Sequence, residues 1–389
     1  MNYIVLDLEW NQGNEKVEKQ RKDVPFEIIE IGAVKMNDRL EICRRSAAGE
    51  SGRPDRPLTD GAFVENDAFA EYDVFHEIVR PRIYHEMHRA TRDILHLDME
   101  DLREGSTFPE VMERFLAWCG TPPGAPASSG KDAPGAGMGG WGMCPPGENV
   151  CEVHACEAGN STLRLPEERP SGDWMFATWA PQDLTELQRN MRYYRMPPLG
   201  SNPVKFYDVQ KLFSIAFEDG KSRRSLKYAV EFLKLPRENA FHRALSDAFY
   251  AAQILEKIRE PQILQKVSFD SFRIPQSRKE EVHIVFDDYA KYISREFEDK
   301  EKLFRDREVA STKCYLCHRN LRKKVKWFTP NGKHYYSISC CSEHGYMKGK
   351  IRVRKTENGG VYAVKTLKFI SEEEAEEILR KKEKHMASS

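Results

Sequence analysis

Near its N-terminus the chain reads Tyr3-Ile4-Val5-Leu6-Asp7-Leu8-Glu9, a short apolar run that leads directly into two acidic residues. The apolar run predicts a buried strand. Side chains at positions i and i+2 of a strand point to the same face, so the carboxylates of Asp7 and Glu9 are expected side by side. Such carboxylates repel each other and are costly to bury, and a shared divalent cation removes both costs. The alternative is a strand end at which both acids are hydrated.

Two further acidic motifs occur far along the chain. The run Met175–Trp179 predicts a strand, and a strongly helical segment begins at Asp183. A later helix, which continues to about Ile258, opens with His242 and Asp247, separated by four residues. Together these motifs supply four carboxylates and one histidine. That is too much negative charge for a cleft without a metal ion, so the sequence predicts a divalent metal site.

This set resembles the catalytic residues of the DEDDh exonucleases, also called the DnaQ-like or RNase T-like family. The His-x4-Asp spacing matches the histidine branch, because Arg243 stands where the tyrosine branch would have Tyr. The Trp179-x3-Asp183 motif is similar to the exoribonuclease side of the family. The resemblance covers roughly residues 1–260. Within the family, the chain resembles the bacterial KapD-like exonuclease branch, with an added zinc-ribbon-like module at the C-terminus.

The resemblance implies a 3′→5′ exonuclease that hydrolyses phosphodiester bonds at the 3′ end of single-stranded nucleic acid, RNA favoured over DNA. It implies two Mg²⁺ or Mn²⁺ ions. Asp7 would bridge them, Glu9 and Asp247 would complete the water-side ion, and Asp183 would reach the second ion through water. His242 would be the general base, a task for which histidine is suited near neutral pH.

Four residues are expected to contact the terminal nucleotides: Trp10, Trp179, His88 and Arg92. For His88 and Arg92 the alternative is a solvated basic face. Trp10 departs from the small or hydroxyl residue often found after the first-motif Glu in the family. Ala180 stands where a glycine is common.

Three strands followed by alternating strands and helices predict an α/β fold with a mixed sheet. Beyond the first strand, the elements expected are strands at 26–35, 74–79, 175–179 and 205–209, and helices at 85–101, 110–119, 211–217 and 223–233, the last with Ser222 as N-cap. The family resemblance implies a ribonuclease H-like mixed five-stranded sheet with flanking helices, joined to a small C-terminal zinc-binding domain.

The predicted domains are an exonuclease domain over 1–260, a helical linker or arm over 261–312, a basic zinc-ribbon-like module over 313–370, and a charged helix and tail over 371–389. Two segments of the first domain, 46–73 and 120–173, are rich in Gly, Pro and Ala and are predicted to be disordered insertions. The second holds Cys144, Cys151, His154 and Cys156, whose spacing is not typical of a structural zinc site.

The C-terminal module contains the candidate ligands of one structural Zn²⁺. Cys314-x2-Cys317 supplies half of a tetrahedron, and the other half is drawn from Cys340, Cys341 and His344. Residues 301–370 carry 17 Lys or Arg and 5 Asp or Glu, a local net charge of +12. The aromatic residues among these charges are Trp327, Phe328, Tyr335 and Tyr336. This composition is typical of a surface that binds phosphates and stacks bases. The alternatives are aromatics that form the core of the module and a pair of buried free thiols.

The whole chain of 389 residues has 61 basic and 61 acidic residues, so its net charge predicts no partner. It has no apolar run of 18 residues, and we expect no membrane association and no cleaved leader. Nine clustered cysteines favour the reducing cytoplasm over a disulfide framework. Two other functions are weighed: a regulatory binding protein on an exonuclease fold, like an inhibitor of a sporulation kinase pathway, and an exonuclease of the DNA repair or proofreading type. The intact acidic set favours the enzyme.

Overall fold

The structure is a computed structural model that describes residues 2–13, 19–45, 69–120, 174–200, 203–237, 240–270, 272–286, 288–330, 332, 334–356 and 359–387. Most of the two predicted insertions, residues 46–68 and 121–173, lies outside the described residues. Residues 69–73 lie inside the first predicted insertion but are described by the structure, and two of them, Phe69 and Asp73, are buried. Phe69 is buried, and its ring centroid lies 5.0 Å from that of Phe249.

The N-terminal part of the chain forms a mixed sheet with the strand order β3-β2-β1-β4-β5-β6. Its strands are β1 (Asn2–Gln12), β2 (Phe26–Met36), β3 (Val74–Ile78), β4 (Trp174–Thr178), β5 (Lys205–Asp208) and β6 (Ser268–Phe269). β1, β2 and β3 are antiparallel neighbours, whereas β4 and β5 follow β1 in parallel. This confirms the predicted α/β class and the ribonuclease H-like mixed sheet. The two-residue strand β6 adds a sixth member at the edge.

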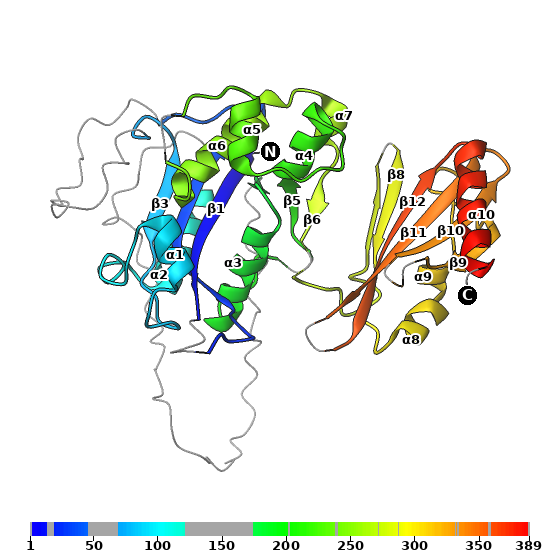
Figure 1. Ribbon diagram of the computed structural model, residues 1–389, viewed down its shortest axis with the longest axis horizontal. Coiled ribbons are helices and arrows are strands. Elements are labelled where there is room, and N and C mark those ends of the chain that lie inside the picture. The colour runs from blue at the N-terminus through cyan, green and yellow to red at the C-terminus, as the bar shows by residue number, and fades with distance from the viewer. Residues whose placement is uncertain are drawn as a thin grey trace, which may run out of the picture.

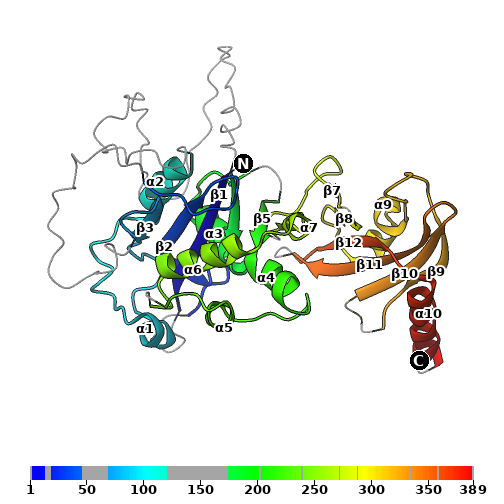
Figure 2. The same ribbon diagram turned by 90° about the horizontal axis from the view of Figure 1, so that it is seen from above.

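Helices cover both faces of this sheet (Figure 1, Figure 2). They are α1 (Arg89–Leu95), α2 (Phe108–Gly120), α3 (Gln182–Tyr193), α4 (Val209–Phe217), α5 (Leu226–Phe232), α6 (Ala244–Lys257) and α7 (Pro261–Leu264). Because strand side chains alternate, Ile4, Leu6 and Leu8 pack with α2 and α3 on one face. Val5 faces the opposite side, where α4, α5 and α6 pack. Asp7 and Glu9 therefore belong to the α6 side.

Two predicted helices are shorter in the structure. The polar segment 85–101 forms only α1, which begins after the N-cap His88 and ends at His96 in a left-handed conformation. The helix expected from Arg223 begins at Leu226, and its N-cap is Ser225 rather than Ser222. The Ser222 hydroxyl instead lies 3.0 Å from a carboxylate oxygen of Asp219. Both differences concern residues that favour local side-chain hydrogen bonds, which compete with helix formation.

The C-terminal part forms a second, antiparallel sheet with the strand order β7-β8-β12-β11-β10-β9. Its strands are β7 (Val282–Val285), β8 (Tyr289–Ile293), β9 (Arg322–Phe328), β10 (His334–Cys341), β11 (Gly345–Lys355) and β12 (Val361–Phe369). The short helices α8 (Lys300–Arg305) and α9 (Arg307–Ala310) and the terminal helix α10 (Glu372–Ala387) accompany it. The Ser371 hydroxyl accepts a hydrogen bond from the Glu374 amide and so caps the start of α10.

This second sheet corrects the expectation of a mainly helical arm over 261–312. β7 and β8 form a hairpin inside that segment, and β8 pairs with β12 from Ile293↔Val364 to Tyr289↔Lys368. Val282 and Ile284 alternate with His283 and Val285 along β7, a period of two that is characteristic of strands. Among the described residues, no helix combines the length and apolar character needed to cross a membrane.

Candidate active site

Four elements bring the predicted acidic residues together. Asp7 and Glu9 lie in the middle of β1, with Asp7 opposite Gly32 and Glu9 opposite Glu30 on β2. β4 runs parallel to β1, so the chain leaves it close to these acids and places Asp183 in the first turn of α3. Asp247 lies in the first turn of α6. The four carboxylates predicted from the sequence thus lie close enough to influence one another electrostatically.

A glycine lets α6 approach the sheet closely enough for this arrangement. A Cβ atom added at Gly32 would lie 2.1 Å from both the Ala244 carbonyl carbon and the Leu245 amide nitrogen. These are backbone atoms at the start of α6, so any larger residue at position 32 must push the helix away. Because Gly32 pairs with Asp7, this contact determines how closely Asp247 approaches the acids of β1.

The clustered carboxylates perturb one another strongly. Burial and the nearby charges of Asp183, Asp247 and Glu9 raise the pKa of Asp7 well above its usual value. Burial, followed by the neighbouring Glu30 and the other acids, raises the pKa of Glu9 to about 9. Burial raises the pKa of Asp183 to about 7, although backbone hydrogen bonds at Asp183 and Leu8 oppose the increase. A cation in this cluster would favour the ionised forms of all these acids.

His242 lies beside the acids on the loop that precedes α6. Ligand atoms of Glu9, His242 and Asp247 all lie within 4.8 Å of one another. The His242 side chain is exposed, and its backbone adopts a left-handed conformation with φ of 65°. Its amide donates a hydrogen bond of 3.2 Å to Asp247 Oδ2. A non-glycine residue in this conformation is strained, and such strain persists where surrounding contacts enforce it.

A buried ion pair next to His242 supplies such contacts, and the sequence analysis did not assign it a role. Arg243 Nε lies 3.2 Å from each carboxylate oxygen of Glu30. His76 Nε2 on β3 lies 2.7 Å from Glu30 Oε1. Burial alone would raise the pKa of Glu30, but His76 and Arg243 lower it overall, so the carboxylate is ionised. The signal in the sequence was an acid, Glu30, inside a mainly apolar strand that also contains Glu27 and Lys35.

We expect Arg243→Ala to lower turnover by roughly 100-fold, the order of loss caused by a misplacement of about 1 Å. Turnover falls because, without the ion pair between Arg243 and Glu30, the backbone of the preceding His242 is no longer held beside Glu9. Steady-state kinetics on an oligonucleotide should show a fall in kcat with little change in KM. Arg224→Ala is the matched control, because Arg224 makes a similar pair with Glu218 on the surface. Equal losses in both variants would contradict a positional role for Arg243.

The four predicted substrate contacts have different environments. Trp10 is half-buried beside Phe26, with ring centroids 5.5 Å apart, and follows an irregularity in the pairing of β1 with β2. Trp179 is 8% exposed and packs in the core near Phe213, so this geometry gives no support to a contact with a base. His88 Nδ1 accepts a hydrogen bond from the Ala90 amide, so this side chain caps α1. Arg92 is exposed on α1.

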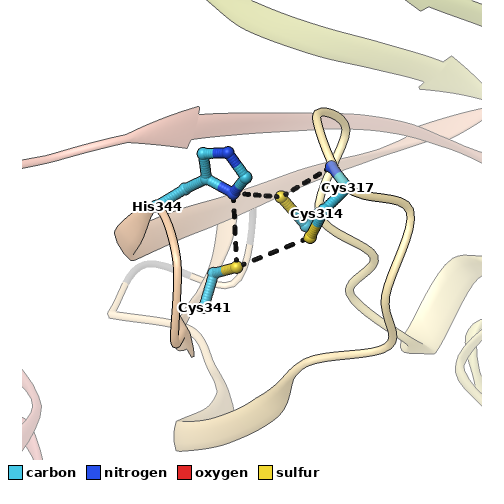
Figure 3. Close-up of side chains that lie close together, drawn as sticks. All are labelled: Cys314, Cys317, Cys341 and His344. Carbon is cyan, nitrogen blue, oxygen red and sulfur yellow. Dashed lines mark hydrogen bonds between the residues drawn. The ribbon is translucent and has the colours of Figure 1, made fainter.

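A second cluster, in the C-terminal sheet, contains Cys314, Cys317, Cys341 and His344 (Figure 3). Cys317 Sγ and Cys341 Sγ lie 3.6 Å apart, and His344 Nδ1 lies 3.6 Å from Cys314 Sγ and 3.5 Å from Cys341 Sγ. A tetrahedral zinc site has sulfur–sulfur edges of about 3.8 Å and sulfur–nitrogen edges of about 3.6 Å, given its usual bond lengths. A disulfide would instead need sulfurs about 2.05 Å apart. The cluster therefore has the dimensions of a zinc site.

The structure resolves which of two adjacent cysteines belongs to this cluster. Successive side chains of β10 point to opposite faces, and Cys341 is the one directed at His344. Cys340 Sγ instead lies 3.7 Å from the carbonyl oxygen of Cys341. A backbone hydrogen bond from Glu343, followed by the hydrogen bond with His344, lowers the pKa of Cys341 to about 6. A thiolate is the form that binds metal ions.

The aromatic residues of the C-terminal module mainly pack inside it. Trp327 donates a hydrogen bond of 2.8 Å to the Ala310 carbonyl, and Tyr335 packs on Phe304 with ring centroids 4.5 Å apart. Phe328 packs against the apolar cluster beneath α10, 6.3 Å from the Tyr336 ring. For these residues the structure favours the core alternative over the expected row of base-stacking side chains.

Comparison with known proteins finds similarity only among solved structures. No family model matches the chain, and no curated protein sequence matches it. Cell-death related nuclease 4 (CRN-4) is 16% identical, with a TM-score of 0.38 over 69% of this chain and 66% of that chain, slightly less than two thirds of its length. The nuclease domain of 3′hExo, a DEDDh family member bound to rAMP, is 14% identical, with a TM-score of 0.39 over 69% of this chain and 96% of that domain. A 3′-exonuclease that recognises the 3′ end of a histone mRNA stem-loop is 14% identical, with a TM-score of 0.40 over 70% of this chain and 72% of that chain.

Proposed function

We propose that this protein is a metal-dependent 3′→5′ exonuclease of the DEDDh type, acting on single-stranded nucleic acid. The observation that carries the proposal is the convergence of Asp7, Glu9, Asp183 and Asp247 beside His242, from three separate segments of the chain. A buried group of mutually repelling acids opposes folding unless cations or protons compensate it. The preference for RNA over DNA and the place in the bacterial KapD-like branch rest on the sequence resemblance.

The acidic cluster fits two Mg²⁺ or Mn²⁺ ions by its chemistry, because carboxylate oxygens are the ligands these hard cations prefer. Asp7, Glu9, Asp183 and Asp247 would hold them. When bound, such ions stabilise the negative charge that develops on the attacking and leaving oxygens of a phosphodiester. The raised pKa values of Asp7, Glu9 and Asp183 support this fit, since a cation would restore the carboxylates to their ionised forms.

The side chains around the proposed metal site have separate roles in the reaction. His242 is exposed next to Glu9 and Asp247, so its imidazole can take a proton from a water molecule that enters the site. Arg243 and Glu30 hold the backbone of His242 in place. Asp183 and Asp247 are anchored at helix starts, which limits their movement during the reaction. A water deprotonated at this position would attack the phosphorus of the last phosphodiester. The bond between that phosphorus and the 3′ oxygen of the preceding nucleotide would break, releasing the terminal nucleotide with its 5′ phosphate and a strand that ends in a 3′ hydroxyl.

We further propose that Cys314, Cys317, Cys341 and His344 hold one structural Zn²⁺. The four side chains come from the loop before β9, from the end of β10 and from the turn into β11. A metal ion bound to all four would tie that loop to the β10–β11 hairpin. This role is structural, because all four tetrahedral positions are occupied by protein ligands.

One assay tests the proposed activity against the regulatory alternative. The purified full-length chain is incubated with RNA and DNA oligonucleotides labelled at the 5′ end, with Mg²⁺ or Mn²⁺, and separately with EDTA. Stepwise shortening from the 3′ end that EDTA abolishes is the expected result, with RNA degraded faster. A protein that only regulates a partner would leave both oligonucleotides intact under every condition.

His242→Asn should reduce turnover by about 10²–10⁴-fold, the usual contribution of a general base. Substrate affinity should stay close to that of the wild type, because the side chain acts on water. Raising the pH should partly restore the rate of the variant by supplying hydroxide. His283→Asn, on β7 of the other sheet, is the control and should retain full activity. A pH–rate profile identical to that of the wild type would refute the role of His242.

A further inference from the structure

We call the part of the chain that contains the mixed sheet the first domain and the part that contains the antiparallel sheet the second domain. A basic cleft of about 670 Å³ lies between them and has no role in the proposed chemistry. One wall is the outer side of α3 and the segment that follows it. The other wall comes from the ends of β11 and β12 that point towards the first domain (Figure 1, Figure 2). Phe272 and Ile274, in the connection between the domains, also line it. The cleft is therefore assembled only when both domains are present.

Nearly all the charged residues that line this cleft are positive. Its lining includes six cationic residues, Arg189, Arg192, Arg195, Arg273, Arg354 and Lys355, and one acid, Glu296. That acid is already engaged, because Thr356 Oγ1 donates to Glu296 Oε1 at 2.6 Å. Cations that face each other across a cleft repel, so the arrangement is stabilised by an anion bound between the walls.

The state of individual arginines supports an anionic ligand. Arg354 Nε is buried and has no hydrogen-bond partner, which is costly for a charged group. Arg192 is exposed, and its guanidinium lies 4.7 Å from the centre of the Phe272 ring. Guanidinium groups bind phosphates through paired hydrogen bonds. The apolar floor beside them, formed in part by Phe272 and Met196, suits the sugar and base parts of a nucleotide better than a bare inorganic ion.

Helix α3 links the candidate active site to the cleft, because Asp183 lies in its first turn and the cleft is lined by residues further along it, mostly on the opposite side of the helix. The cleft begins at Thr185, two residues after Asp183, and extends past Arg192 to Arg195. At 1.5 Å per residue, Arg192 lies about 14 Å along the helix from Asp183. That length corresponds to about four nucleotides at the stacked spacing of 3.4 Å. A strand with its 3′ end at the acidic cluster can therefore reach the cleft only if it is several nucleotides long.

We propose that this interdomain cleft binds the phosphodiester backbone of the single strand whose 3′ end occupies the acidic site. The proposal rests on the proposed nuclease function and deepens it, by making the second domain part of the substrate path. Arg192 of the first domain and Arg354 of the second domain bind phosphates of the strand from opposite walls of the cleft. Dinucleotides are too short to reach these two arginines, so long strands bind more tightly than dinucleotides.

The test compares the double variant Arg192→Ala/Arg354→Ala with the control Arg380→Ala/Lys381→Ala, which removes the same charge from exposed positions of α10. Binding of a fluorescent 20-nucleotide strand is measured by anisotropy in EDTA, so that it does not depend on hydrolysis. The cleft variant should bind about tenfold or more weakly, as expected when charge-assisted hydrogen bonds are lost. The slope of log affinity against log salt should fall by about 1.4, or about 0.7 per lost phosphate contact. Hydrolysis of a dinucleotide should be unchanged.

Three results would overturn the proposal: unchanged affinity for the 20-nucleotide strand, an equal loss in the α10 control, or a parallel loss of dinucleotide hydrolysis. A nucleoside diphosphate is titrated in parallel. If the cleft variant loses only nucleotide binding and keeps the strand, the cleft holds free nucleotides instead. Should the double variant unfold, the single variant Arg192→Ala at an exposed position carries the same test. Absence of hydrolysis in the wild type would refute the nuclease, whereas the binding measurements would still decide the cleft.

Discussion

Asp7→Asn is expected to abolish metal-dependent degradation and, at the same time, to stabilise the metal-free protein at pH 8. Activity should fall by at least about 10³-fold, because Asp7, which interacts electrostatically with each of the other acids, no longer contributes its charge to the site that stabilises the transition state. Stability should rise by about 1–3 kcal/mol, the scale of a poorly compensated buried polar group. Chemical denaturation and an oligonucleotide assay on the same preparation would measure both effects.

The pH dependence of stability gives this prediction a second readout. Asp7, Glu9 and Asp183 have raised pKa values in the folded protein, with Asp183 at about 7 and Glu9 at about 9. Between their ordinary values near 4 and these raised values, the folded state binds more protons than the unfolded state. Stability of the metal-free protein must therefore fall as the pH rises from about 4 to about 9. Added Mn²⁺ should reverse the loss at pH 8.

Asp7→Asn should show a shallower fall over the same pH range and a smaller response to Mn²⁺. Glu113→Gln is the control, because Glu113 is an exposed acid on α2 and should behave like the wild type. The assignment of the site would be wrong if Asp7→Asn kept its activity. It would also be wrong if the variant were less stable than the wild type in EDTA at pH 8.

Cys341→Ser should remove the proposed zinc ion, whereas Cys340→Ser should retain it. The two cysteines are adjacent in β10, but only Cys341 faces His344 and the other two thiols. Metal analysis after gel filtration should find about one zinc per chain in the wild type and in Cys340→Ser, and none in Cys341→Ser. Equal zinc content in the two variants would contradict the ligand set.

Loss of the zinc ion should lower the thermal stability of the second domain without unfolding it completely. The second sheet has apolar clusters of its own, such as that around Leu303, Ile351 and Ala363, which do not depend on the cysteines. We expect the melting temperature of Cys341→Ser to fall by at least about 10 °C, since about 1 kcal/mol shifts a domain of this size by roughly 4–8 °C. Differential scanning calorimetry would measure it, with Cys340→Ser as the reference.

The local pattern of the sequence was sufficient to predict the acids of the proposed active site and the strand and helices that contain them. Asp7 and Glu9 share a face because strand side chains alternate, and Asp183 and Asp247 open helices that their flanking residues specify. The proposed zinc ligands Cys314 and Cys317 were also predicted from the sequence, since their spacing suits a metal-binding turn. These features depend on neighbours within a few residues, which the sequence displays directly.

Other features depended on contacts between distant segments. Burial of the Glu30 carboxylate against Arg243 and His76 unites three segments, and no spacing rule connects them. The same is true of the core position of Trp179 and of the partner strand β12, which makes β8 an interior strand of the second sheet.

The sequence by itself determined which residues are candidates for the proposed chemistry, because alternation and helix starts are properties of short stretches. Only the tertiary structure decided between Cys340 and Cys341, since the choice depends on which face of β10 meets His344. It also decided that Arg192 and Arg354 face one cleft, although 161 positions separate them in the chain. Packing between distant segments determines the positions of these groups. The free energy of that packing comes mainly from burying apolar surface, and local sequence patterns do not show which distant segments will pack together.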